Sequence, residues 1–325
     1  MRRILEVASN LTVVSIVACL ALCLAAAAQN SRPIFSKRIP LTQTPSTDPK
    51  PQPNFTQPPG FVSFSVPGST YTVAYGVNNL GEIVGAFVSG GVGFGFLRDA
   101  SGRFRKISVP GSSFTIAQDI NDLDEIVGWY GLPNGPTQGF IEHHGVYTTL
   151  SYPGAVTTAV DGINNAGDVV GVYQTPTQHG FIYTHGEFQT IDPPGSVGTL
   201  VEKISNTGEI VGAYNLSSTE GSGFTLSNGI FSDINYPGAV GTQVVGVNDQ
   251  GDLAGGWNNE QAFVYQNTTQ RFTGFAVKGS GDCAAEGINN SHEIVGFYVS
   301  GGTFYGYYRL PSSSDTDLFE ADPIP

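Results

Sequence analysis

Two residue types recur along the chain in positions that could carry chemistry. An acidic residue follows a turn in six places, at Glu82, Glu125, Asp168, Glu209, Asp252 and Glu293. An aromatic residue then ends a short apolar segment in each place, at Phe87, Tyr130, Tyr173, Tyr214, Trp257 and Tyr298. Six carboxylates at one radius could bind cations or supply the acids of a glycosidase. Six rings near one rim could stack on sugars or other flat ligands.

Each set also has a structural interpretation, which we favour. A turn acid commonly accepts hydrogen bonds from nearby backbone amides, and repeated aromatic residues commonly pack between neighbouring units. The turn from Asn121 to Glu125 is the richest in oxygen atoms, but it lacks the glycine and the distal bidentate glutamate of a calcium loop. The sequence therefore predicts no metal site and no cofactor.

Histidine and cysteine give weak signals for catalysis. The five histidines lack the spacing of a zinc site. His143, His144 and His185 precede a glycine in expected turns, where a left-handed backbone is useful. Cys283 occupies a position that is threonine in the other copies, at Thr72, Thr115, Thr158, Thr199 and Thr242. We expect its thiol to be buried and inert, with a reactive thiol as the alternative.

These residues belong to a segment that is repeated six times along the chain. A turn glycine recurs at steps of 41 or 43 residues, at Gly68, Gly111, Gly154, Gly195, Gly238 and Gly279. Each copy divides into four short β-strands, which in the third copy are expected near 158–163, 168–173, 180–183 and 187–191. Four antiparallel strands in about 40 to 45 residues are typical of one propeller blade. The sequence therefore predicts an all-β fold, a six-bladed β-propeller.

The two ends of the repeat array complement each other. The last copy stops after its third strand, expected at 306–310, and lacks a fourth. Residues Phe61 to Phe64, followed by Pro67 and Gly68, match the fourth strand of the third copy. We expect strand 61–66 to complete the last blade and close the ring, which would also remove an open sheet edge.

The repeat resembles that of the HAF-repeat family of exported bacterial proteins, which is typified by GINNxGxIVGxY followed by HGF or HAF. The matching segments are GINNAGDVVGVY, KISNTGEIVGAY, GINNSHEIVGFY, QHGF at 178–181 and QAF at 261–263. Asp124 and His292 replace the turn glycine, and only His179 keeps the family histidine. The resemblance covers residues 61–310 and implies export and repeats, but no reaction.

The N-terminus indicates export. Arg2 and Arg3 precede an apolar run, 11–28, that ends in small residues, as in a secretory signal peptide cleaved after Ala28. The alternative is a lipoprotein cleaved before Cys19. The expected organisation is a signal peptide (1–28), a disordered tether rich in Pro, Thr and Ser (29–60), the propeller (61–310) and a flexible acidic tail (311–325).

Charge and motif content narrow the function classes. A net charge of −13 argues against a nucleic-acid partner, because phosphate binding needs a basic surface. GxSxG, Walker and dinucleotide motifs are missing from the sequence. We therefore expect a secreted or cell-envelope, non-catalytic and monomeric protein, with no membrane span in the mature chain. It would bind a glycan or cell-surface component through its variable loops, 89–93, 131–138, 174–178 and 215–222. The alternative is a secreted polysaccharide hydrolase or lyase that uses the turn carboxylates.

Overall fold

The computed structural model describes residues 60–217, 221–257, 261–277, 280 and 282–310. Within them the chain forms strands β1 to β24 and no helix. Accordingly, no helix of the described part is long and apolar enough to cross a membrane. The predicted signal peptide, the tether up to residue 59 and the predicted tail lie outside the described residues.

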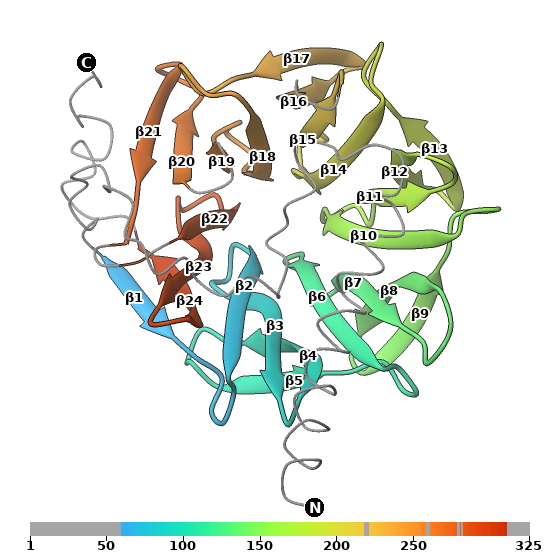
Figure 1. The fold of residues 1–325 in the computed structure, drawn as a ribbon, viewed down its shortest axis with the longest axis vertical. Coiled ribbons are helices and arrows are strands. Elements are labelled where there is room, and N and C mark those ends of the chain that lie inside the picture. Colours follow the sequence, from blue (N-terminus) through green and yellow to red (C-terminus); the bar gives the residue numbers. More distant parts are fainter. Residues whose placement is uncertain (1–59, 218–220, 258–260, 278–279, 281, 311–325) are drawn as a thin grey trace, which may run out of the picture.

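The strands form six four-stranded antiparallel sheets arranged as blades in a ring (Figure 1), as the repeat spacing predicts. Blade 1 contains β2 (Tyr71–Val77), β3 (Ile83–Ser89), β4 (Val92–Arg98) and β5 (Phe104–Ile107). Blade 2 contains β6 (Phe114–Ile120), β7 (Ile126–Gly131), β8 (Thr137–His143) and β9 (Val146–Leu150). Blade 3 contains β10 (Thr157–Ile163), β11 (Val169–Gln174), β12 (Gln178–Thr184) and β13 (Glu187–Ile191). The next two are blade 4 with β14 (Gly198–Ile204), β15 (Ile210–Asn215), β16 (Gly221–Ser227) and β17 (Ile230–Ile234), and blade 5 with β18 (Thr242–Val247), β19 (Leu253–Trp257), β20 (Gln261–Gln266) and β21 (Arg271–Phe275). Blade 6 contains β22 (Cys283–Ile288), β23 (Ile294–Ser300), β24 (Thr303–Arg309) and β1 (Phe61–Phe64).

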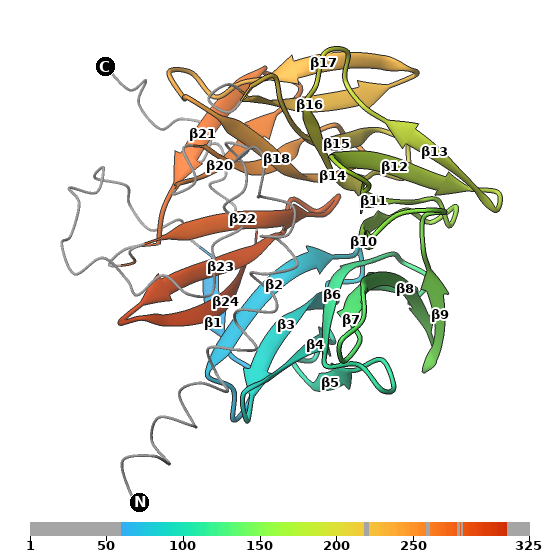
Figure 2. The ribbon, with the colours of Figure 1, turned by 45° about the vertical axis from the view of Figure 1, so that its right-hand side comes forward.

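The outermost strand of blade 6 comes from the beginning of the propeller sequence. β1 pairs antiparallel with β24, with Phe61 opposite Arg309 and Phe64 opposite Gly306, and the two strands lie side by side in both ribbon views (Figures 1 and 2). This is the place that the sequence analysis gives to these residues, although the strand ends at Phe64 and not at Val66. The ring of Phe61 stacks on Tyr307 at 4.7 Å, so side chains as well as backbone join β1 to the blade.

The core lies between the blades. Each blade buries one large aromatic residue of its third strand completely, at Phe96, Phe140, Phe181, Phe224, Phe263 and Tyr307. These are the aromatic residues of the predicted HGF-like segments. Residues of one blade pack against those of the next, as where Val127 of blade 2 joins Val160 and Phe181 of blade 3 in one cluster. Burial of this apolar surface is the main force that holds neighbouring blades together.

The turn between the first two strands is closed by a side chain as well as by the backbone. In blade 3 only Gly167 of this turn adopts the left-handed conformation, with φ of 80°. Asn164 instead uses its side-chain oxygen to accept hydrogen bonds from the backbone N–H groups of Ala166 and Asp168. An asparagine suits this position because its side chain closes the turn. In blade 4 Ser205 does the same by accepting the Glu209 N–H.

Candidate functional site

The turns between first and second strands surround a small polar hollow of about 60 Å³ on the propeller axis. The second turn residue of every blade faces its counterpart in the next blade. Its backbone N–H donates to that counterpart's side-chain oxygen, at 2.8–2.9 Å in all six cases. The participants are Asn79, Asp122, Asn165, Asn206, Asp249 and Asn290, and the last donates back to the first. We call this set the turn ring.

The turn ring satisfies its own polar groups. The Oδ2 atom of Asp122 accepts from the side-chain amides of Asn79 and Asn165, and Asp249 does the same with Asn206 and Asn290. These bonds hold the pKa of Asp122 below its usual value, although burial acts in the opposite direction. A ligand at this mouth would have to displace existing bonds, so the turn ring is a structural closure of the propeller.

An ion pair between blades 2 and 4 lines the same hollow. Lys203 of blade 4 places its ammonium 3.1 Å from Oδ1 of Asp119 of blade 2 and donates to the Gln118 carbonyl at 2.6 Å. The position of these two residues is glycine in the other blades, at Gly76, Gly162, Gly246 and Gly287. A methyl group on Gly162 would lie 2.8 Å from the Lys203 Cα atom, so glycine lets the inner strands approach.

The six turn acids mostly serve their own turns. Asn78, Asn121, Asn164 and Asn289 donate side-chain hydrogen bonds to Glu82, Glu125, Asp168 and Glu293. Asp252 is bound by His292 of the next blade, with Nε2 and Oδ2 2.8 Å apart. Within the described residues no group of three or more acidic, histidine or cysteine side chains could hold a metal ion. The acids therefore lie near separate blades, not in one common site.

The six aromatic residues lie at the ends of the second strands, and five of them are buried, with exposed fractions of 5–7%. The tyrosines of this set use their hydroxyl groups within the protein, as where Tyr214 donates to Asp233. Only Tyr298 is half-buried, and its hydroxyl is bonded to Ser63 of β1. Little of these ring faces is open to a flat ligand, and packing between strands and blades accounts for their recurrence.

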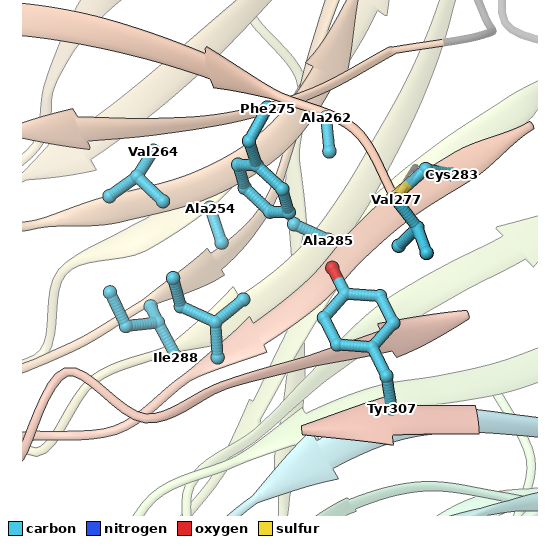
Figure 3. Close-up of a cluster of buried hydrophobic side chains, with 10 residues drawn as sticks. Ala254, Ala262, Val264, Phe275, Val277, Cys283, Ala285, Ile288 and Tyr307 are labelled. Atoms are coloured by element: carbon cyan, nitrogen blue, oxygen red, sulfur yellow. The ribbon is translucent and has the colours of Figure 1, made fainter. Parts of the chain in front are cut away.

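The thiol of Cys283 lies in a buried cluster with Val277, Ala285 and Tyr307 (Figure 3). Burial raises its pKa to about 12, so the reactive thiolate is scarce at neutral pH. His144 and His185 have φ of 49° and 52°, as their places before a glycine predict. For His143 the prediction was wrong, because it is the last residue of β8 and has no positive φ. His292 likewise adopts φ of 60° where the repeat has glycine.

A different group of residues meets at the outer end of blade 3, beside the variable loop 174–178. The Nδ1 atom of His179 lies 2.7 Å from Oδ2 of Asp192, and its Nε2 atom lies 2.8 Å from Oγ1 of Thr177. Thr177 is exposed, while about three-tenths of the His179 and Asp192 side chains is exposed. We call Tyr152, Tyr173, Thr177, His179 and Asp192 the blade-3 rim.

Two tyrosines support the histidine of the blade-3 rim. Tyr152 stacks face to face on Tyr173 at 3.6 Å with an interplanar angle of 3°. Tyr173 in turn stacks on the His179 ring at 5.2 Å. Both tyrosine hydroxyls are bonded to Thr190, which fixes the orientation of the stack. Three layered rings therefore end in an imidazole that carries polar partners on both nitrogens.

Sequence reasoning predicted a site on the variable loops and named Tyr173, but it did not single out Thr177 or Asp192. A signal was present in the repeat. The corresponding pair in blade 2 is Gln138 and Ser151, bonded at 3.3 Å, and both pairs are 13 residues apart in sequence. Blade 3 has a histidine and a carboxylate where blade 2 has a neutral pair, which is a chemical change at a contact that these two blades share.

A second polar surface lies between blades 1 and 2. A groove of about 740 Å³ is lined by three acids together with arginine and histidine side chains, at Glu82, Asp99, Asp124, Arg103, Arg105 and His144. Burial raises the pKa of Glu82, and the Asp124 carboxylate raises it further, against the hydrogen bond from Asn78. Hydrogen bonds from Ser101 and from the Arg103 backbone hold the pKa of Asp99 well below its usual range.

Known structures share this architecture. No family model matches the chain, and no curated protein matches its sequence. A mutant of AofleA from Arthrobotrys oligospora is similar with a TM-score of 0.51 and 10% identity, over 76% of this chain and 86% of that one. An Aleuria aurantia lectin mutant in complex with Fucα1-6GlcNAc gives 0.50 and 11%, over 75% and 93%. Virginiamycin B lyase from Staphylococcus aureus with quinupristin gives 0.47 and 10%, over 77% and 99%. The first two structures support the fold alone at these identities, and the sheet order of the chain itself makes it a six-bladed β-propeller.

Proposed function

We propose that the protein is an exported, monomeric propeller that binds a glycan or another component of the cell envelope. The observation that carries this proposal is the blade-3 rim, where hydrogen-bonding groups lie beside stacked aromatic rings next to a variable loop. Sugars present many hydroxyl groups, so a few precisely placed polar groups can bind them, and here the stacked rings hold those polar groups in place. Export rests on the sequence pattern of residues 1–28.

The rim is suited to recognition because its parts are rigid. Tyr173 and His179 lie on β11 and β12, and Asp192 fixes the imidazole at 2.7 Å. Exposed Thr177 and the accessible part of Asp192 can exchange hydrogen bonds with a ligand. The likeness to a lectin crystallised with a fucosylated disaccharide makes a glycan the first ligand class to test.

The test is a glycan array with the purified chain, its H179A variant and a control. H179A removes the imidazole that ends the ring stack, and we expect it to lower glycan binding up to about tenfold, because a hydrogen bond is worth about 0.5–1.5 kcal/mol. The control is Q138A, at the same position of blade 2. Binding that is equal in H179A and the parent would place the ligand elsewhere, and loss in Q138A alone would point to blade 2.

One observation favours the second candidate, a polysaccharide hydrolase or lyase that uses turn carboxylates. Glu82, a turn acid with a raised pKa, and Asp99, with a lowered one, line the same groove. Two carboxyl groups whose pKa values diverge are the usual acid and base of glycoside cleavage. Release of reducing ends from polysaccharides by the parent, and its loss in E82Q but not in E293Q, would favour this candidate.

A further inference from the structure

The hydrogen-bond chain of the blade-3 rim has a geometry that ligand binding does not require. A hydroxyl, an imidazole and a carboxylate lie in series, with 2.8 Å from Thr177 Oγ1 to His179 Nε2 and 2.7 Å from His179 Nδ1 to Asp192 Oδ2. Nucleophilic hydrolases use this order, in which a base lies within hydrogen-bond reach of the nucleophile and a third group orients the base.

The partners determine which atoms carry the protons. An ionised carboxylate only accepts hydrogen bonds, so the neutral imidazole must carry its proton on Nδ1 and direct it to Asp192. Nε2 is then an acceptor, and the Thr177 hydroxyl must donate to it. The hydroxyl proton therefore already points at the atom that would remove it. Stacking on Tyr173 and the second Asp192 contact, from the Gly180 N–H to Oδ1 at 3.4 Å, restrain this arrangement.

We propose that Thr177 is a nucleophile toward small, neutral acyl esters, with His179 as its general base and Asp192 as the residue that positions His179. Thr177 is exposed on the loop between β11 and β12, so an ester can reach it from solvent. Neutral esters are the expected class because the net charge of −13 repels anionic substrates. O-acetyl groups of carbohydrates belong to this class. The activity goes beyond the binding function proposed above and does not depend on it.

The reaction balances without any further reactant than water. Thr177 Oγ1 attacks the ester carbonyl carbon while its proton passes to His179 Nε2. The C–O bond to the alcohol then breaks, and His179 returns the proton to the departing alcohol. Water, deprotonated by His179, then attacks the acyl-threonine. The bond from the acyl carbon to Thr177 Oγ1 breaks, His179 returns the proton to Oγ1, and the acid and free Thr177 result. General-base assistance of this kind contributes roughly 10²- to 10⁴-fold to such a step, so we expect slow turnover with activated esters.

The test uses the mature protein and p-nitrophenyl acetate, with release of p-nitrophenol as the readout. T177V removes the nucleophile but preserves the branched shape, and we expect it to lower the protein-dependent rate at least about tenfold. T177S keeps the hydroxyl, and we expect it to remain within about threefold of the parent. Mass spectrometry of the parent quenched early should find acetyl on the peptide that contains Thr177.

Two controls separate this mechanism from simpler ones. A surface imidazole can attack an aryl ester unaided, so a rate that T177V leaves unchanged would overturn the proposal. H143A and H144A report the background rate from exposed histidines that are not part of the Thr177–His179–Asp192 hydrogen-bond chain. Q138A reports changes at the matching site of blade 2. For Asp192 we expect D192N to lower kcat while KM stays within about twofold, because a positioning residue acts on the imidazolium formed in the transition state. Equal loss in kcat and substrate affinity would instead indicate a collapsed loop.

Discussion

At the scale of single residues, the fourth turn position shows how one side chain changes a contact between blades. Four blades have glycine there, while blade 2 has Asp124 and blade 6 has His292, with φ of 63° and 60°. Asp124 approaches the turn acid Glu82 of blade 1, a contact of like charges that raises the Glu82 pKa in addition to burial. His292 approaches the turn acid Asp252 and bonds to it. One position therefore opposes folding in one blade contact and favours it in another.

We predict that D124G raises the free energy of unfolding by about 0.5–1 kcal/mol at pH 7, because it relieves both the left-handed backbone and the like-charge contact. When a carboxyl group has a raised pKa in the folded state, the protein loses stability as pH rises through that pKa. The gain from D124G should therefore be larger at pH 7 than below pH 4.5, the ordinary Glu value. Urea unfolding at both pH values measures this.

The matched variant is H292G, which relieves the same backbone strain but removes the bond to Asp252. Hydrogen bonds from His292 lower the Asp252 pKa, although burial acts against them, so this carboxyl contributes stability above its unfolded value that is lost at lower pH. We expect H292G to change stability little at pH 7, since the two effects offset each other. A gain equal to that of D124G would show that backbone strain alone matters.

The position of Cys283 illustrates a second residue-scale constraint. In four other copies the aligned threonine accepts the backbone N–H of the residue six positions earlier, as Thr72 does from Val66. In the remaining copy, the fourth, that residue is Pro193, which has no N–H, and Thr199 donates to Ser196 instead. Cys283 accepts from Val277, so its sulfur does the work of a threonine hydroxyl.

We predict that C283T unfolds within about 1 kcal/mol of the parent, because the hydroxyl accepts the same bond. C283V should be destabilised by about 1–3 kcal/mol, because it leaves the Val277 N–H buried without a partner. Denaturant titration of both variants measures the difference. The two variants match in shape, so equal stability would mean that the bond to Val277 contributes nothing.

At the scale of elements, the fold could be predicted from sequence because its determinants are local and repeated. Turn residues, strand length and the copy spacing each fall within one blade, and the missing fourth strand was matched by Phe61 to Phe64. The strand bounds were less accurate, as where β24 begins at Thr303 and not at Gly306. The turn ring was not predicted, because its bonds join residues 41, 43 or 211 positions apart and depend on the curvature that brings turns together.

The blade-3 rim escaped prediction for a related reason. His179 and Asp192 lie on different sides of a strand turn, and only the register of β12 against β13, with Gly180 opposite Ile191, brings them within bonding distance. For the aromatic rings of the second strands, the sequence allowed two interpretations, a surface that stacks on ligands and packing between blades, and packing was favoured. Burial of Tyr130 at 5% exposed depends on how neighbouring blades press together, which residue order alone does not fix.

The element with the clearest expected role is β1. Phe64 of β1 packs near Phe96 and Phe104 of blade 1 at 6.0 Å, so the strand joins blade 1 to blade 6. We predict that deletion of residues 61–66 lowers the melting temperature by several degrees or produces oligomers, because β24 then presents an open edge. Calorimetry and light scattering measure both effects. A monomer that melts like the parent would show that closure needs no β1.

At the scale of the whole molecule, two sets of polar contacts near the axis link the blades in addition to the hydrophobic core. They are the turn ring and the ion pair of Lys203 and Asp119. The turn ring joins each blade only to its neighbours. The pair of Lys203 and Asp119 instead joins blades 4 and 2, with blade 3 between them. Asp119 also accepts the Ile163 N–H of blade 3 at 3.2 Å, so three blades meet at one carboxylate.

This carboxylate makes the axis sensitive to both mutation and pH. Burial raises the pKa of Asp119, while Lys203 lowers it. We predict that K203M destabilises the protein by about 3 kcal/mol at pH 7, because it leaves a buried charge without its partner. Its Asp119 pKa must rise further, so the deficit should shrink as pH falls and Asp119 becomes protonated. The double variant D119N/K203M removes both charges and should recover most of the loss. Thermal melting between pH 4 and 8 distinguishes these outcomes. A K203M deficit that is constant with pH would mean that lost packing of the lysine side chain, and not the unpaired buried charge, destabilises the protein.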